Sequence, residues 1–505
     1  MKLYKLSAVM FSALLLASCS DIDNQEYAGG AISGEQSQET NSAIPSRTKA
    51  TFAGMFTLIG DPCHNYQTHF SDTRPDDFGF VMSAISLDLE GADMSMQDNG
   101  YNWFSASDEL SSRNANYANP YVRYVIPYTS LGIANDIINA FPADTKDAEA
   151  INMIAQAKTI RAFDYLSLAP YFQGSYQTSK DKPCVPLLDG KNDYTNNPRA
   201  TVAEVYTAII DDLSYAIDNL TDAREDKSRI NKSVALGLRA RAYLYMGEYA
   251  KALVDAEAAM KGYTPASLAD VSVPGFDDSS ASNWMWTYDL TDDQVASAAA
   301  SYATAASWMS AFCGQGYAVA TGNVPMINKL LYDKIPATDV RKGWWLDENL
   351  HSPLLANLEW KDSKGNVLAK GDAIAPLKIK DVKEPLVAYA NVKFGMKSGV
   401  GSSKNNNSWP LMRVEEMILI EAECLAQTGN EAKAKEVLAN FVKTYRDPSY
   451  KIPASRSLLD EIWFQRRVEL WGEGFFIVDA KRLGKPIVRF HQGVANNFPS
   501  AYQFN

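Results

Sequence analysis

The clearest architectural signal lies in residues 233–263, which read SVALGLRARAYLYMGEYAKALVDAEAAMKGY. Small and aromatic residues recur there at helical spacing, among them Ala240, Tyr243, Ala252 and Ala256. Alanine side chains let two helices approach closely, and Gly247 provides the turn between them. The stretch therefore predicts two packed helices joined by a tight turn.

This pattern is that of a tetratricopeptide repeat, and it recurs along the chain. A second copy covers residues 414–441, with Gly429 at its turn, and a weaker one covers residues 151–220. Helical spacing of apolar residues also predicts a helix over 121–140. Roughly 150 residues separate the two clear copies. We therefore expect a mainly α, tetratricopeptide-like scaffold with a large insertion.

One helix boundary is marked by its capping residues. Apolar residues at helical spacing predict a helix over 203–220. Thr201 precedes it and Glu204 follows three residues later, which is the pattern of a capping box. A further helix is expected over 411–426.

The insertion covers about residues 265–410 and has a different composition from the scaffold on either side of it, about 49–264 and 411–505. It is rich in Gly, Pro, Ser, Asn and aromatic residues, and seven of the ten tryptophans lie in 281–410. Residues 360–368 predict a hairpin with its turn at 363–366. We expect a loop-rich, partly β insertion that carries a ligand-binding surface on a rigid helical frame.

Composition excludes several classes of protein. The 505 residues carry 48 Lys and Arg against 60 Asp and Glu, so the net charge of −12 disfavours binding to nucleic acid. Five cysteines cannot form a disulfide scaffold, and four histidines without an H-E-x-x-H motif disfavour a zinc hydrolase. The sequence contains no Walker A or G-x-S-x-G motif. We expect no metal and no cofactor.

The first residues are typical of an export signal. Residues 1–18 begin with Lys2 and Lys5, continue with an apolar run and end at Leu16-Ala17-Ser18-Cys19. This junction resembles a bacterial lipobox, which implies cleavage before Cys19 and lipidation of its thiol. Residues 19–48 then form a lipidated N-terminus and a polar tether. We expect acyl chains to anchor the protein to the membrane without spanning it.

Two segments near the C-terminus carry a family resemblance. Residues 412–423, MRVEEMILIEAE, resemble a segment of the SusD/RagB family of Bacteroidetes nutrient-binding lipoproteins. A second family motif lies in 465–482, where Gln465 replaces a Glu and Phe476 replaces an Arg. The residues that match this motif are Arg466, Glu469, Leu470, Glu473, Gly474, Asp479 and Arg482. Further matches lie at 157–162, 183–187 and 205–213, so that together with the lipobox the resemblance covers almost the whole chain.

The resemblance implies a function. It implies a non-enzymatic, cell-surface lipoprotein of the outer membrane, facing the cell exterior. Such a protein captures oligosaccharides and delivers them to a SusC-like TonB-dependent transporter. Three alternatives remain open: the same architecture capturing oligopeptides, a tetratricopeptide-type adaptor for a protein partner, and a secreted glycosidase.

Aromatic side chains are the candidate ligand contacts, because an aromatic ring covers the apolar face of a sugar. We expect contributions from Tyr101, Trp103, Trp286, Tyr302, Trp308 and Tyr317. Trp286 alternates with Trp284 and Tyr288 at period two, which is also typical of a buried strand. For Trp103 and Trp308 we expect that alanine substitution weakens binding and leaves stability unchanged.

The acidic residues of the C-terminal motif have a structural interpretation. Glu469 and Glu473 are four residues apart and are flanked by Arg466 and Arg482. On one helix this spacing favours ion pairs between helices over an acid/base pair for catalysis. We therefore expect no enzymatic activity from these carboxylates.

Overall fold

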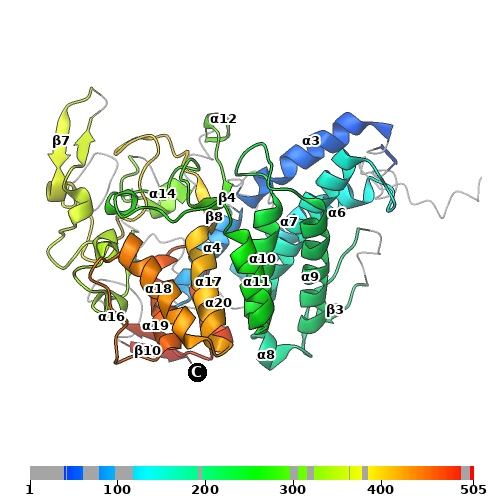
Figure 1. The fold of residues 1–505 in the computed structure, drawn as a ribbon. Coiled ribbons are helices and arrows are strands. Elements are labelled where there is room, and N and C mark those ends of the chain that lie inside the picture. The colour runs from blue at the N-terminus through cyan, green and yellow to red at the C-terminus, as the bar shows by residue number, and fades with distance from the viewer. Residues whose placement is uncertain are drawn as a thin grey trace, which may run out of the picture.

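The computed structural model describes residues 39–40, 43–60, 79–96, 118–190, 196–295, 305–314, 324–362, 364–377, 385–490 and 501–504. It is mainly helical, with small two-stranded sheets, as the sequence predicts. Figure 1 shows the longer helices in the centre and on the right, and the loop-rich insertion with α14, β7 and α16 on the left. No helix in the described part of the chain combines the length and apolar character needed to cross a bilayer.

The N-terminal half supplies most of the long helices. They pack in sequence, α6 on α7, α7 on α9, and α10 on both α9 and α11. The elements are α3 (Pro45–Met55), η1 (Thr57–Ile59), α4 (Gly79–Leu89), β1 (Met94–Met96), α6 (Ala118–Asn139), α7 (Ala148–Phe172), α8 (Tyr176–Ser179), β2 (Pro183–Pro186), β3 (Arg199–Thr201), α9 (Val202–Asn219), α10 (Lys232–Met246) and α11 (Tyr249–Ala259).

The predicted helix pair over 233–263 is confirmed as α10 and α11. Ala240, Ala252 and Ala256 are fully buried, because the helices pack on one another at these small residues. Gly247 has φ of 77°, a left-handed conformation that only glycine adopts without strain, and it ends α10. The capping box of Thr201 is also confirmed, at the start of α9.

The C-terminal block repeats this arrangement. Its elements are α17 (Val414–Gln427), α18 (Glu431–Tyr445), α19 (Leu458–Glu469), α20 (Phe476–Leu483), β9 (Ile487–Phe490) and β10 (Ala501–Phe504). The second predicted repeat is confirmed as α17 and α18, with Gly429 at φ 86° between them. α11 packs against α17, so the two repeats are neighbours although the insertion separates them in sequence.

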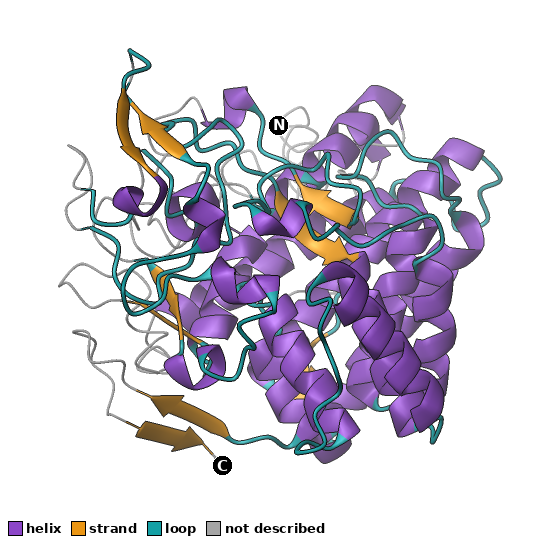
Figure 2. Ribbon diagram, turned by 60° about the vertical axis from the view of Figure 1, so that its left-hand side comes forward, coloured by secondary structure: helices purple, strands orange, loops and turns teal. Residues whose placement is uncertain are grey.

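The insertion is loop-rich and partly β, as predicted. It consists of short elements, which Figure 2 shows surrounded by loops. They are η3 (Asp270–Ser272), β4 (Trp284–Tyr288), α12 (Asp292–Val295), α14 (Ala305–Met309), β5 (Pro325–Ile327), α16 (Lys329–Tyr332), η4 (Val340–Trp344), η5 (Pro353–Leu355), β6 (Glu359–Lys361), β7 (Val367–Lys370) and η6 (Gly371–Ile374). β6 and β7 form the hairpin predicted over 360–368.

An antiparallel strand pair closes the insertion. β4 pairs with β8 (Trp409–Arg413), with Trp284 opposite Arg413 and Tyr288 opposite Trp409. All residues of β4 are buried, so the period-two aromatics form a buried strand. α17 follows β8 directly, because strand geometry changes to helix between Arg413 and Val414. The end of the insertion is therefore joined to the start of the second repeat.

Candidate functional site

Two junctions bring together short segments of chain that are far apart in sequence. At the first, β1 pairs antiparallel with β5, and Met96 stands opposite Pro325. A third segment joins them, because Asn391 N donates to Pro325 O at 2.9 Å and Ile327 N donates to Tyr389 O at 3.1 Å. The junction therefore joins three stretches of chain. β5 follows β1 by about 230 residues in sequence, and residues 389–391 follow β5 by about 60.

The second junction joins residues 292–314 to residues 401–406. Asp292 accepts from Lys404 Nζ at 3.2 Å and from Asn406 Nδ2 at 2.9 Å. Gly314 N donates to Ser402 O at 2.9 Å, and Gly401 N donates to Phe312 O at 2.8 Å. Gly401 has φ of 81°, and a side chain there would overlap the Trp360 ring, so glycine is required at this position.

Most predicted binding residues lie outside the described residues. They are Tyr101, Trp103, Tyr302 and Tyr317; the lipidation residue Cys19 also lies outside that range. The segment that contains Tyr101 and Trp103 begins after Met96, at the first junction. The segment that contains Tyr317 runs from Gly314 at the second junction to Val324 beside the first.

The other two predicted residues, Trp286 and Trp308, lie in the hydrophobic core. Both have no exposed surface. The Trp286 ring packs edge-to-face on Phe163 at 4.9 Å, and its Nε1 donates to Ser228 O at 3.1 Å. Neither ring is accessible to a sugar in this structure. Trp286 and Trp308 therefore pack in the core and do not form the expected ligand contacts. All seven tryptophans of the insertion are buried, so its tryptophan content reflects a hydrophobic core.

A buried cluster of charged residues joins the insertion to the C-terminal block. Glu469 accepts from Arg446 Nε and Nη2, both at 2.8 Å, and from Arg341 Nη1 and Arg413 Nη1, both at 3.2 Å. All four side chains are at most 1% exposed. Burial raises the pKa of the Glu469 carboxyl, but the guanidinium groups outweigh it and hold that pKa below its ordinary value.

Glu473 belongs to the same cluster but not to the same helix. α19 ends at Glu469, and Gly472 and Gly474 turn the chain with φ of 85° and 86°. Glu473 then accepts from Arg413 Nε at 2.9 Å and Lys393 Nζ at 3.0 Å. Burial lowers the pKa of Lys393 to about 8, against the raising effect of the Glu473 carboxylate.

Glu469 and Glu473 form ion pairs as predicted, but with other partners than the flanking arginines. Arg466 and Arg482 do not pair with Glu469 or Glu473; both bind Asp479, and Arg482 also binds Glu423. The partners Arg341 and Lys393 come from the insertion, far away in sequence. Local spacing carries no signal for such contacts. The acid groups are all held by cations, which is the expected structural role.

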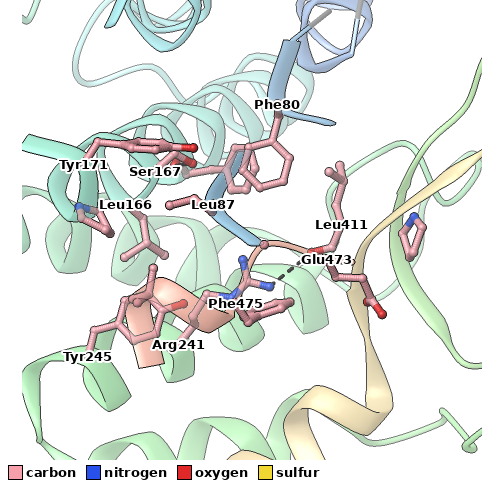
Figure 3. Close-up of a pocket in the computed structure, with 15 residues that line it drawn as sticks. Phe80, Leu87, Leu166, Ser167, Tyr171, Arg241, Tyr245, Leu411, Glu473 and Phe475 are labelled. Atoms are coloured by element: carbon pink, nitrogen blue, oxygen red, sulfur yellow. Dashed lines mark hydrogen bonds between the residues drawn. The ribbon is translucent and has the colours of Figure 1, made fainter. Parts of the chain in front are cut away.

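A cavity in the interior is too small to hold a sugar. It has a volume of about 40 Å³ and lies between α4, α7, α10 and the turn at Glu473–Phe475. Figure 3 shows Arg241 beside it, with Leu411 and Phe475 close by. Arg241 Nη2 donates to Leu411 O at 3.2 Å, and Glu416 binds the same guanidinium. This volume accommodates one or two water molecules.

Metal binding has no support in the part of the structure that is described. Among those residues no group of three or more His, Cys, Asp or Glu side chains could hold a metal ion. The thiols of Cys184, Cys313 and Cys424 are buried, and Cys424 lies on α17.

The helical-repeat scaffold with its loop-rich insertion defines the protein as a binding protein of the SusD type. The chain belongs to the SusD/RagB family. A family model described as "Starch-binding associating with outer membrane" matches residues 80–244, and one described as "SusD family" matches residues 380–500. The family is one of non-catalytic binding proteins, and its description indicates association with the outer membrane.

Individual relatives agree with this membership. SusD-like protein P2 of Formosa agariphila is 24% identical over 261 residues, 51% of this chain and 46% of that protein. The chain spans less than half the length of the curated relatives it matches.

Two solved structures share the fold. A SusD-like carbohydrate binding protein of Bacteroides vulgatus has a TM-score of 0.66 at 21% identity, covering 91% of this chain and 88% of its own. Surface glycan-binding protein A of Bacteroides thetaiotaomicron, solved with laminarihexaose, has a TM-score of 0.60 at 17% identity, covering 87% and 90%.

Proposed function

We propose that this protein captures oligosaccharides at the cell surface and delivers them to a SusC-like TonB-dependent transporter. Its membership in a family of carbohydrate-binding outer-membrane proteins carries the proposal. The fold is shared with a glycan-binding protein solved with laminarihexaose, so β-glucan oligosaccharides are the first ligands to test.

The two junctions support a binding surface formed by the predicted aromatics. Tyr101 and Trp103 follow Met96 by five and seven residues, and Tyr317 precedes Pro325 by eight. Because Met96 and Pro325 are paired, we propose that the segment after β1 and the segment before β5 contribute side chains to one ligand site.

The expected affinity follows from the chemistry of a sugar. An aromatic platform removes the C–H face of a ring from water, which contributes about 25 cal/mol per Å². Each hydroxyl that exchanges a water hydrogen bond for a protein one gains roughly 1 kcal/mol. A few such contacts give dissociation constants in the micromolar to millimolar range, about −4 to −8 kcal/mol.

Calorimetry with a ligand panel tests the proposal. The panel contains laminari-, malto- and other plant and fungal oligosaccharides together with casein peptides. We expect binding to one glycan class without hydrolysis, and a loss of about tenfold or more in affinity for Trp103→Ala. Tyr243→Ala, on the scaffold helix α10, is the matched control and should bind normally.

Each other result points to a different conclusion. A response to casein peptides alone would replace glycan capture by the oligopeptide alternative. Normal glycan binding by both Tyr101→Ala and Trp103→Ala would refute the assignment of the site while leaving glycan capture intact. If no ligand of the panel binds and the protein instead captures a protein partner, the adaptor function is favoured.

Membrane anchoring and the transporter need separate tests. We propose that Cys19 carries the lipid, so Cys19→Ala should lose metabolic labelling with palmitate and leave the membrane fraction. Purification of the lipidated protein from membranes should recover a SusC-like partner. If the Cys19→Ala variant still incorporates palmitate, the lipid is attached at another residue.

A further inference from the structure

The packed pair of helices α6 and α7 buries two polar groups that the described part of the chain leaves without a hydrogen bond. Asp164 of α7 is 6% exposed, and Ser130 of α6 is 3% exposed. Neither Asp164 Oδ2 nor Ser130 Oγ has a hydrogen-bond partner among the described residues, so no direct bond joins the two side chains. Buried polar atoms in folded proteins almost always have a partner, so one is expected here.

A small cavity lies beside both groups. Its volume is about 20 Å³, which is enough for one water molecule and too little for a larger ligand. Its polar lining comes from Ser83, Ser130, Asp164, Ser167 and Tyr171, and the rest of its lining is apolar.

Two further hydroxyl groups of the lining already use their hydrogen atoms. Ser167 Oγ donates to Phe163 O at 2.8 Å, and Tyr171 Oη donates to Ser83 O at 2.7 Å. Figure 3 shows Ser167 and Tyr171 beside the larger interior cavity, which they also line. These hydroxyls can therefore only accept a hydrogen bond from a molecule in the small cavity.

The cations of the two helices are paired with other acids. Arg161 of α7 binds Asp212 of α9 at 2.7 Å. Arg123 of α6 forms an ion pair with Glu90. Among the described residues no cation is paired with Asp164, so nothing in this part of the structure compensates a negative charge there.

The surroundings of Asp164 favour its uncharged form. Burial raises the pKa of the Asp164 carboxyl well above its ordinary value of 3.8, and the Ser130 hydroxyl lowers that pKa by less. Tyr171 is the other titratable residue of the lining. An uncharged carboxylic acid donates one hydrogen bond and still accepts others, which a carboxylate cannot do.

We propose that this cavity binds one water molecule, which accepts a hydrogen bond from the uncharged carboxylic acid of Asp164 and donates one to Ser130 Oγ. An internal water needs two to four polar partners. The two unsatisfied groups supply two of them, and the oxygens of Ser167 and Tyr171 are further acceptors. The site lies between the scaffold helices α6 and α7 and does not depend on glycan binding.

The substitution Asp164→Asn tests the charge of the side chain. Asparagine has almost the shape of the acid, offers both a donor and an acceptor to the water, and needs no proton. In the wild type, the stabilising effect of the proton on Asp164 is full below the ordinary value of 3.8 and is lost as pH rises towards the raised folded value. The Tm of the variant, relative to wild type, should therefore rise by about 1 °C per pH unit between about pH 5 and pH 7.

Asp255→Asn is the matched control for this calorimetric measurement. Asp255 is 4% exposed, but it pairs with Arg239 at 2.7 Å. Its substitution removes an ion pair and should lower Tm throughout the same range of pH. Asp164→Asn should instead melt above the wild-type temperature at neutral pH.

High-resolution crystallography tests the water itself. We expect a density peak within about 3.2 Å of both the Asp164 carboxyl and Ser130 Oγ. Ser130→Ala removes one of the two unsatisfied groups and should lose the peak. Ser167→Ala, which changes a hydroxyl already bound to Phe163 O, should keep it.

Three results would overturn the proposal. The first is a direct hydrogen bond between Asp164 and Ser130 with no peak in the cavity. The second is a Tm difference between Asp164→Asn and wild type that does not change with pH, because it would show an ionised carboxylate. The third is a wild-type Tm that rises with added sodium or potassium chloride while that of Asp164→Asn does not, which would identify a cation as the occupant. Should Ser130→Ala fail to fold, the wild-type crystal structure and the pH dependence of Asp164→Asn still decide.

Discussion

The substitution Glu469→Gln tests whether the buried charge cluster holds the insertion on the scaffold. Glutamine has almost the same shape as glutamate, so no cavity is created. The change removes the negative charge that lies between the guanidinium groups of Arg341, Arg413 and Arg446. It also turns an acceptor into an amide N–H₂ that faces donors, so at least one guanidinium N–H loses its partner.

The cost follows from the burial of these groups. Removing one partner of a buried ion pair costs about 3–5 kcal/mol, because the opposite charge stays buried without compensation. A chain of 505 residues has an unfolding entropy of roughly 1 kcal/mol per degree, from about 2.1 cal/mol/K per residue. The expected loss is therefore about 3–5 °C in Tm.

Differential scanning calorimetry at neutral pH measures this loss. Glu436→Gln is the matched control, because Glu436 pairs with Lys433 on the exposed face of α18, and both side chains are about half exposed. Exposed pairs contribute little, so the control should change Tm by less than about 1 °C. A Glu469→Gln variant that melts within 1 °C of wild type would refute the argument.

The pH dependence of Tm gives a second test of the role of Glu469. The pKa of Glu469 is depressed in the folded state, so its stabilising effect is present above the unfolded value of about 4.5 and is lost as pH falls through the folded value. The difference in Tm between wild type and Glu469→Gln should be constant above about pH 5 and should shrink in acid. A difference that grows below pH 4.5 would contradict the assigned sign.

Three further predictions concern single features of the fold. Thr201→Ala removes the capping box of α9 and should cost about 1 kcal/mol, lowering Tm by about 1 °C in calorimetry. Trp308→Ala should lower Tm by about 3–5 °C through lost core packing, where the sequence had suggested a loss of binding alone; unchanged Tm would place the ring outside the core. The hydrogen bond to Asp372 raises the pKa of His351 above 6.5, so NMR titration of Asp372→Asn should show that pKa falling towards 6.5.

The scaffold could be predicted because its signals are local. Helix pairs show in the spacing of alanines, a left-handed turn requires Gly247, and Thr201 with Glu204 marks a helix start. Each of these depends on residues a few positions apart. The hairpin of β6 and β7 could be predicted for the same reason, because consecutive residues specify its turn.

The contacts of the insertion could not be predicted, because they depend on long-range packing. A tryptophan in an aromatic-rich loop has the same local sequence whether it faces a ligand or the core. Trp308 and Trp286 are buried because distant helices cover them, and neighbouring residues do not encode that. For the same reason Glu469 binds Arg341, which is 128 residues away, instead of Arg466 three residues away.

The charge cluster fixes the insertion to the scaffold. Arg341 and Lys393 come from the insertion and bind Glu469 and Glu473 of the scaffold block, while Asp339 pairs with Arg341 within the insertion. The described members balance, with the cations Arg341, Lys393, Arg413 and Arg446 set against Asp339, Glu415, Glu469 and Glu473. Losing one charge leaves its buried opposite uncompensated, so single substitutions there are strongly destabilising. The residues proposed to bind glycan are not members of the cluster, so their substitution can change the ligand without releasing the insertion from the scaffold.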